Sequence, residues 1–185
     1  MVKKNVCVFI SGTGTNLKAL IKSSREYNFP INISCVVSNT INANGLNFAR
    51  MFRIPFYILN SNKKLNLELI LQILKHKNIS LICLAGYMKI LKKNFISAFN
   101  GRIINIHPSL LPKYKGLNTF KRVLISKEKI TGCTVHYVNQ KLDAGKIILQ
   151  KKIFIESNDN EKTLKAKVQQ AEYRTYSESI IKIFK

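Results

Sequence analysis

Tryptophan is absent from this chain and acidic side chains are scarce: 9 Asp and Glu stand against 31 Lys and Arg, which gives a formal net charge of +22. An excess of this size is typical of proteins that bind nucleic acid. The basic residues are scattered, however, and Lys, Asn and Ile are all abundant, as A+T-rich codons would produce. The sequence also has no helix-turn-helix, zinc-finger or RNA-binding-sheet motif. We therefore favour genome bias as the cause of the charge and do not expect a nucleic-acid partner.

Cysteine and histidine are also few. The four cysteines, Cys7, Cys35, Cys83 and Cys133, are widely spaced and form no C-x-x-C pair. Buried thiols in a reducing compartment fit this spacing better than disulfides do. Only three histidines are present, and they offer no set of ligands at a spacing that metal sites use. We expect no metal.

No apolar run approaches the roughly 18 residues that a membrane-spanning helix needs. The first apolar stretch, residues 6–10, is followed at once by Ser11 and Gly12, so it predicts a buried strand and not a signal peptide. The sequence has no Ser/Gly linker, internal repeat or low-complexity tail. We expect a cytoplasmic protein with one domain over residues 1–185, because this length suits one sizeable core.

Short apolar runs alternate with stretches of helical periodicity. This alternation, with uninterrupted apolar strands, predicts an α/β, Rossmann-like fold: a mostly parallel central sheet with helices on both faces, and a C-terminal antiparallel strand portion. Strands are expected at residues 6–10, 31–37, 56–59, 81–85, 102–106, 131–138 and 147–155. Helices are expected at residues 16–27, 43–52, 65–76, 90–99, 117–126 and 161–183.

A glycine-rich loop, SGTGTNL at residues 11–17, follows the first expected strand and opens the first expected helix. Gly12 and Gly14 permit a tight turn close to a ligand, and the free amides of a helix amino end attract anions. The loop therefore predicts a phosphate cradle that includes Gly12, Gly14, Thr15 and Asn16. It matches neither the dinucleotide fingerprint nor the Walker motif, and an ordinary glycine turn with a capping Thr or Asn is the alternative.

The most informative segment is NIHPSLLP at residues 105–112. Asn105 and His107 are two residues apart at the end of an expected strand, so their side chains lie on one side of it. The amide can donate to a developing oxyanion, and the imidazole can donate or transfer a proton. Pro108 and Pro112 stiffen the loop that follows. We interpret Asn105 and His107 as candidate catalytic residues, with a polar strand end as the alternative.

Asp143 is the third candidate. A carboxylate near His107 would favour the charged imidazolium and could accept the proton that a reacting amine loses. Spacing alone does not bring Asp143 to His107, and an Asp before Ala-Gly is more often a turn former. His136, within an expected strand, is a secondary candidate that we expect to line or fill the core. Glu172, taken alone, is expected on the surface.

Six segments in sequence order resemble the phosphoribosylglycinamide formyltransferase family, a folate-dependent family of purine synthesis. They are ISGTGTNL (10–17), LAGYMKIL (84–91), NIHPSLLPKY (105–114), GCTVHYV (132–138), LDAG with ILQ (142–150) and VQQAE (168–172). The resemblance implies attack by the glycinamide amine of the ribotide on the formyl carbon of 10-formyltetrahydrofolate, which is a co-substrate. It implies a ribotide-phosphate half over roughly residues 1–100 and a folate and catalytic half over roughly residues 101–185.

The resemblance also implies roles for residues. Asn105 and His107 would stabilise the oxyanion, His107 would act as the acid, and Asp143 would assist proton transfer. The ribotide would be held by Gly12, Gly14, Thr15, Asn16, Gln169, Gln170 and Glu172. The folate would be held by Met88, Lys89, Ile90, Leu91, Asn105, Asn139, Gln140, Lys141, Leu142 and Asp143, with Lys63 or Lys64 as a further candidate.

The chain also departs from the family. Lys115 and Asn118 replace a usual Pro and His, and Ala144-Gly145-Lys146 stands where Gly-Gly-Pro is usual. The runner-up is the catalytic domain of a methionyl-tRNA formyltransferase, which shares the Asn-x-His and Ser-Leu-Leu-Pro features and would use the charge to bind tRNA. A non-catalytic nucleic-acid-binding module gives no reason for Asn105, His107 and Asp143 to occur together. We expect a monomer or a homodimer, with small-molecule substrates and no membrane.

Overall fold

The computed structural model describes residues 2–59 and 67–185, which form two compact units, one up to residue 104 and one over residues 105–185. The first unit contains β1 (Lys4–Ile10), α1 (Thr15–Ser24), β2 (Ile31–Ser38), α2 (Gly45–Met51), β3 (Phe56–Ile58), α3 (Leu67–His76), β4 (Leu81–Leu84) and α4 (Lys93–Ala98). The second contains α5 (Thr119–Ile125), β6 (Ile130–Tyr137), β7 (Ile147–Phe154) and α6 (Glu161–Phe184). Strand β5 (Arg102–His107) includes residues of both.

The strands form one sheet in the order β3-β2-β1-β4-β5-β6-β7. Strand β1 pairs in parallel with β2 and β4, and β2 pairs in parallel with β3. Strands β6 and β7 pair antiparallel. The predicted α/β fold, with a mostly parallel sheet and a C-terminal antiparallel portion, is therefore confirmed.

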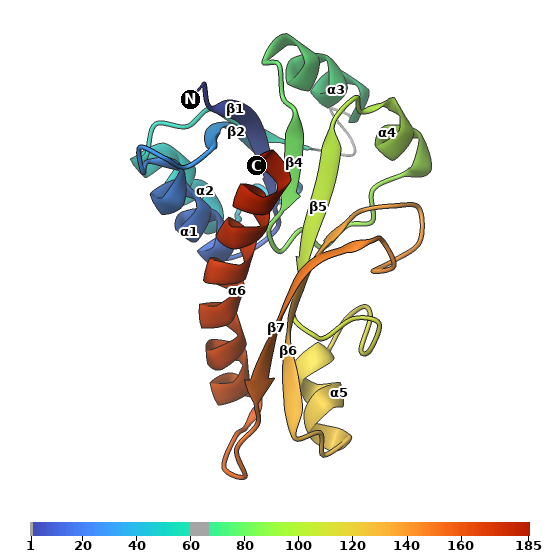
Figure 1. Ribbon diagram of the computed structural model, residues 1–185. Coiled ribbons are helices and arrows are strands. Elements are labelled where there is room, and N and C mark those ends of the chain that lie inside the picture. The colour runs from blue at the N-terminus through green and yellow to red at the C-terminus, as the bar shows by residue number, and fades with distance from the viewer. Residues whose placement is uncertain (1, 60–66) are drawn as a thin grey trace. The chain divides into compact units, whose positions relative to one another are not determined.

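The first unit has apolar strands covered by helices. The last five residues of β1 are buried, as is all of β4, so these strands form the centre of its core. Figure 1 shows α1 and α2 on one side of these strands and α3 and α4 on the other. Right-handed crossovers produce this arrangement when successive strands are added first on one side of β1 and then on the other. It places the carboxyl ends of β1, β2 and β4 at one edge, where ligands bind in open parallel sheets.

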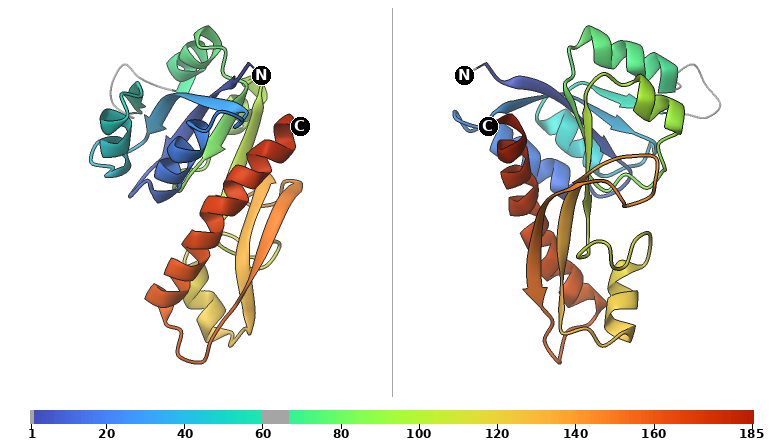
Figure 2. Two further views of the ribbon diagram at one scale, coloured as in Figure 1. Left: turned by 60° about the vertical axis from the view of Figure 1, so that its left-hand side comes forward. Right: turned by 45° about the vertical axis from the view of Figure 1, so that its right-hand side comes forward.

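In the second unit, α6 packs along β6 and β7 and also contacts α5 (Figure 2). The helix begins with a capping box, in which the Asn160 side chain accepts from the amides of Lys162 and Thr163 while the Thr163 hydroxyl accepts from the Asn160 amide. Such a box satisfies amides that the first turn leaves without a partner. Val168 and Tyr176 lie on its buried face, so α6 closes the core of this unit.

Four of the expected helices are longer than the observed ones, and those expected at residues 43–52 and 117–126 correspond to Gly45–Met51 and Thr119–Ile125. The helix expected at residues 16–27 ends at Ser24, because Arg25 donates back to Lys22 and the exposed residues that follow offer no apolar face. The helix expected at residues 90–99 begins only at Lys93, because Lys92 is extended with φ −63° and ψ 145°. The prediction is wrong for residues 90–92, although Leu91 is buried as its apolar side chain requires.

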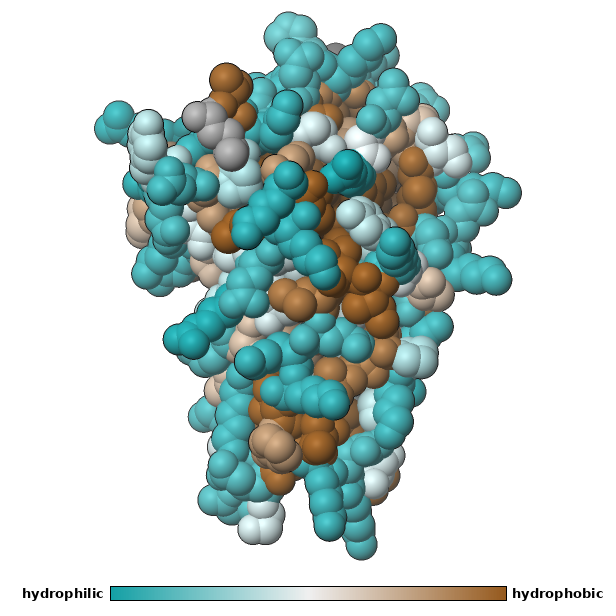
Figure 3. Space-filling view, in the orientation of Figure 1, coloured by the Kyte–Doolittle hydropathy of each residue, from teal (hydrophilic) through white to brown (hydrophobic). Residues whose placement is uncertain are grey.

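Most charged side chains of the described residues lie outside the core, whereas Asp143 and Glu172 are buried. In Figure 3 polar groups cover most of the face in view, with apolar side chains between them. Exposed apolar residues do occur, including Met88, Ile90 and Phe154. Within the described ranges, no helix is both long enough and apolar enough to span a bilayer.

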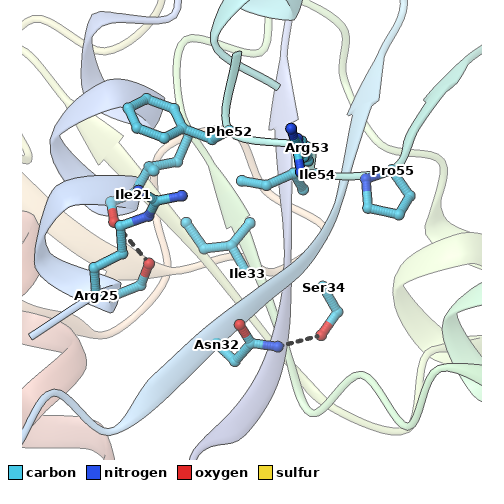
Figure 4. A pocket seen from close by; sticks show the side chains of 10 residues that line it. Ile21, Arg25, Asn32, Ile33, Ser34, Phe52, Arg53, Ile54 and Pro55 are labelled. Atoms are coloured by element: carbon cyan, nitrogen blue, oxygen red, sulfur yellow. Dashed lines mark hydrogen bonds between the residues drawn. The ribbon is translucent and has the colours of Figure 1, made fainter. Parts of the chain in front are cut away.

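A cavity of about 380 Å³ lies in the first unit beside the amino end of β2 (Figure 4). Arg25 and Arg53 stand near one rim, Asn32 and Ser34 lie at the other, and Ile33 lies between them. The Arg25 guanidinium covers the Phe52 ring at 4.5 Å from its centroid. Because the cavity is at the amino end of β2, it is separate from the carboxyl edge of the sheet, where ligands bind in open parallel sheets.

Candidate active site

The glycine loop turns from β1 directly into α1. Gly14 has φ +71°, and a Cβ atom on it would overlap the Cα of Gly45 at the start of α2. The Gly45 amide donates to the Gly12 carbonyl at 2.9 Å, so α2 supports the loop from behind. The first amides of α1 receive no capping bond from Gly14, which has no side chain. The amino end of this ten-residue helix therefore has the free amides that attract an anion, and the phosphate site stays a prediction.

Ser11 links three strand ends at the same edge. Its hydroxyl donates to Asn39 Oδ1 at 2.5 Å and accepts from the Met88 amide at 2.7 Å. Asn39 follows β2 and Met88 follows β4, so the expected phosphate loop and the start of the expected folate segment are in contact. Sequence reasoning missed both Asn39 and Gly45, because neither belongs to a motif and only the parallel pairing brings them to the loop.

The side chains of the expected folate segment, residues 88–91, differ in exposure. The Met88 and Ile90 side chains are 69% and 77% exposed and Lys89 is also exposed, whereas Leu91 is 5% exposed and fills the core. Met88 and Ile90 therefore have apolar surface available for a ligand. Lys63 and Lys64 lie outside the described residues.

In the second unit, β5 carries Asn105 and the buried His107. His107 Nδ1 lies 3.4 Å from Asp143 Oδ2, so the contact that spacing could not predict is present. His107 Nε2 lies 2.9 Å from the Tyr114 carbonyl oxygen. Both ring nitrogens of His107 thus face oxygen atoms that can accept a hydrogen bond.

Asp143 is held in place by the backbone around it. It is buried with φ +45°, and its Oδ2 accepts from the Gly116 amide at 2.9 Å. The preceding loop has bonds of its own: Asn139 Oδ1 accepts from the Lys141 amide, and Asn139 Nδ2 donates to the Ala144 carbonyl. A Cβ atom at Gly145 would overlap the Tyr137 carbonyl, so glycine is required directly after this loop.

His136 lies beside Asn105 and Asp143 and so belongs to the same group of polar side chains. Its Nδ1 lies 2.9 Å from the Tyr137 carbonyl, which can only accept, so Nδ1 carries the proton. Nε2 then accepts from Asn105 Nδ2 at 3.2 Å and lies 3.7 Å from Asp143 Oδ1. Burial lowers the pKa of His136 and keeps this ring neutral, against smaller opposing effects of the Tyr137 carbonyl and Asp143. His136 therefore fixes which way the Asn105 amide points.

The loop after β5 is tied to β6 and β7 through Thr134 and Gln150. The Thr134 hydroxyl donates to the Ser109 carbonyl at 2.6 Å and accepts from the Leu111 amide at 3.0 Å. Gln150 Nε2 donates to the Leu111 carbonyl at 2.8 Å. Sequence reasoning assigned no role to Thr134 or Gln150, although both lie in segments that carry the family resemblance.

The expected ribotide residues of α6 differ in burial. Glu172 is only 6% exposed, so the expectation of a surface residue is wrong. It faces Cys133, whose pKa is raised to about 11 mainly by burial and further by the Glu172 charge. Gln169 is half-buried and Gln170 is exposed. Among the described residues, no group of three or more His, Cys, Asp and Glu side chains is arranged to hold a metal ion.

Comparisons with known proteins agree with this geometry. The profile of the formyl transferase family matches residues 4–180. The phosphoribosylglycinamide formyltransferase of Haemophilus influenzae is 43% identical over 94% of this chain and 84% of its own length. The human trifunctional purine biosynthetic protein adenosine-3 is 41% identical over 94% of this chain, which spans 18% of that protein.

A solved structure gives the same result for the fold. The phosphoribosylglycinamide formyltransferase of Anaplasma phagocytophilum superimposes with a TM-score of 0.91 at 40% identity, over 97% of this chain and 85% of that one. The agreement extends over nearly the whole of both chains, in sequence as well as in fold. This chain belongs to the phosphoribosylglycinamide formyltransferase family.

Proposed function

We propose that the chain transfers the formyl group of 10-formyltetrahydrofolate to the amine of 5'-phosphoribosylglycinamide, as a step of de novo purine biosynthesis. The products are 5'-phosphoribosyl-N-formylglycinamide and tetrahydrofolate. Family membership supports a formyltransferase of this kind. The observation that carries the chemistry is the 3.4 Å contact between His107 and Asp143, beside an Asn105 amide oriented by His136.

The reaction needs stabilisation of one developing negative charge and two proton movements. The amine attacks the formyl carbon, and the carbonyl oxygen becomes an oxyanion. Asn105 has one amide hydrogen bound to His136 and a second free of that bond, which can donate to the oxyanion. The imidazolium of His107 adds positive charge beside it.

Collapse of the tetrahedral intermediate breaks the bond from the formyl carbon to N10 of the folate. N10 needs a proton, for which His107 is the donor. The amine must lose a proton, which Asp143 accepts directly or through water. The attacking amine is itself the nucleophile, so no covalent enzyme intermediate is required.

Binding roles follow from the same proposal. The ribotide phosphate is assigned to the amino end of α1, with Gln169, Gln170 and Glu172 for the rest of the ribotide. The folate is assigned to residues 88–91 and 139–143. We further propose a cytoplasmic enzyme without a metal cofactor, with the ribotide-phosphate half over residues 1–100 and the folate half over residues 101–185.

The runner-up, a methionyl-tRNA formyltransferase domain, is not favoured by the relatives that match nearly the whole chain. A direct assay separates the two. Purified protein is given 10-formyl-5,8-dideazafolate with either glycinamide ribonucleotide or charged initiator tRNA, and deformylation is followed spectroscopically. Deformylation that requires the ribonucleotide supports the proposal, and formylation of the tRNA alone would contradict it.

A further inference from the structure

One short backbone segment contacts both members of the His107–Asp143 pair. Within residues 113–116, which we call the clamp segment, the Tyr114 carbonyl accepts from His107 Nε2 at 2.9 Å. Two residues later the Gly116 amide donates to Asp143 Oδ2 at 2.9 Å. A shift of this segment would therefore move the hydrogen-bond partner of His107 and that of Asp143 together.

The clamp segment adopts a backbone conformation that needs outside support. Tyr114 has φ +56°, in the left-handed region that side chains other than glycine rarely adopt, and Gly116 has φ +79°. This conformation is what turns the Tyr114 carbonyl and the Gly116 amide to the same pair of side chains. Because Tyr114 is disfavoured there, contacts elsewhere must hold it.

Those contacts come from two residues outside the pair. Glu128 Oε1 accepts from the Tyr114 hydroxyl at 2.8 Å and from Lys113 Nζ at 2.9 Å. Arg122, on α5, donates from Nη1 to the Lys115 carbonyl at 2.6 Å, and its guanidinium lies 5.5 Å from the centre of the Tyr114 ring. Glu128 and Arg122 thus hold the segment through the Lys113 and Tyr114 side chains and the Lys115 carbonyl, groups other than those that contact His107 and Asp143.

We propose that Glu128 and Arg122 are positioning residues, which hold the clamp segment so that its carbonyl and amide fix the relative geometry of His107 and Asp143. The expected effect on turnover rests on the proposed function, whereas the role of Glu128 and Arg122 in holding His107 and Asp143 in place does not. The alternative is an ordinary surface ion pair. The Lys113 side chain is 65% exposed and that of Glu128 25%, so the pair itself contributes little to stability.

The test uses the full chain with ¹⁵N-labelled histidine, since three histidines give few ring signals. Glu128→Ala removes the acceptor, whereas Glu128→Gln keeps an oxygen that the Tyr114 hydroxyl can reach. Glu156→Ala is the matched control, because Glu156 is another carboxylate of the second unit that pairs with a lysine, Lys167 at 3.1 Å, and its side chain is 66% exposed. His107→Ala identifies the His107 signals.

Glu128→Ala is expected to lose the slowly exchanging Nε2 proton signal of His107 and to lower kcat about tenfold, since misplacement by a fraction of an ångström is enough for such a loss. KM values for both substrates should stay within about twofold, and the melting temperature should match that of Glu156→Ala. Glu128→Gln should recover most of the signal and of kcat.

The outcomes separate the two proposals. Loss of the His107 signal in a Glu128→Ala protein, when even the wild type transfers no formyl group, would support the clamp and overturn the proposed function. An unchanged His107 signal in Glu128→Ala would overturn the clamp, whatever happened to kcat. The clamp would also be overturned if Glu128→Gln lost as much of the His107 signal and of kcat as Glu128→Ala does. The oxygen that accepts from the Tyr114 hydroxyl would then not hold the segment in place.

Discussion

Asp143 is the residue that contacts most of the other groups in the candidate site. One oxygen receives the Gly116 amide and faces His107, while the other lies 3.7 Å from His136. Burial makes these electrostatic interactions stronger than they would be in water, so few groups suffice to set the charge of the site. Single substitutions here should affect turnover far more than folding.

His107→Ala and Asp143→Asn are each expected to lower kcat by about 10²- to 10⁴-fold, the range typical of a lost acid or base. Alanine removes the proton donor. Asparagine keeps the size and one acceptor for the Gly116 amide, but it can neither accept a proton nor balance the imidazolium. Steady-state kinetics and circular dichroism provide the measurement. Near-wild-type turnover of either variant with a native spectrum would remove that residue from the mechanism.

A pH dependence should come from His136. Because burial lowers its pKa below 6.5, the folded state binds this proton less readily than the unfolded chain does. Its contribution to the free energy of unfolding is therefore complete above pH 6.5 and is lost as the pH falls from 6.5 through the pKa of the folded state. Urea unfolding of the wild type and of His136→Gln across this range measures the effect. A His136 contribution that grew on acidification would contradict it.

At the scale of elements, the junction between β1 and α1 depends on the close approach of Gly14 and Gly45. Gly14→Ala should destabilise the protein by about 1–3 kcal/mol, since it forces a left-handed φ on alanine and a clash with α2. It should also raise KM for the ribotide, because the proposed phosphate site shares this backbone. For stability, Gly12→Ala is the matched control, as a Cβ there meets nothing within 4 Å. Equal effects of the two substitutions on urea unfolding would contradict this prediction.

Most elements were predictable from the sequence because their apolar runs are buried as strands or as one face of a helix. The start of α4 was not, since residues 90–92 contain buried Leu91 without being helical. The Asn105–His107 pair was also predictable, because both lie on one strand. The contact with Asp143, 36 positions away, was not. It arises from the return of β6 beside β5 and from a left-handed residue that no periodicity reveals.

At the scale of the whole molecule, the net charge of +22 matters because the proposed substrates are anions. The ribotide carries a phosphate and the folate carries carboxylates. A positive field raises the rate of encounter with such ligands without any specific contact. Genome bias can explain how the lysines arose, and this physical effect would still follow from them.

The net charge therefore predicts that salt lowers the rate at which the protein captures its substrate and leaves the chemical step unchanged. Between about 10 and 100 mM salt the screening length falls from about 30 to about 10 Å, so kcat/KM for the ribotide should fall several-fold. The value of kcat should stay within about twofold, because the proposed chemistry would occur among His107, His136 and Asp143, which are buried. Initial rates in NaCl and in choline chloride separate screening from binding of a particular ion. If kcat/KM stayed constant in both salts, the positive field would have no part in substrate capture, and codon composition would be the remaining account of the charge.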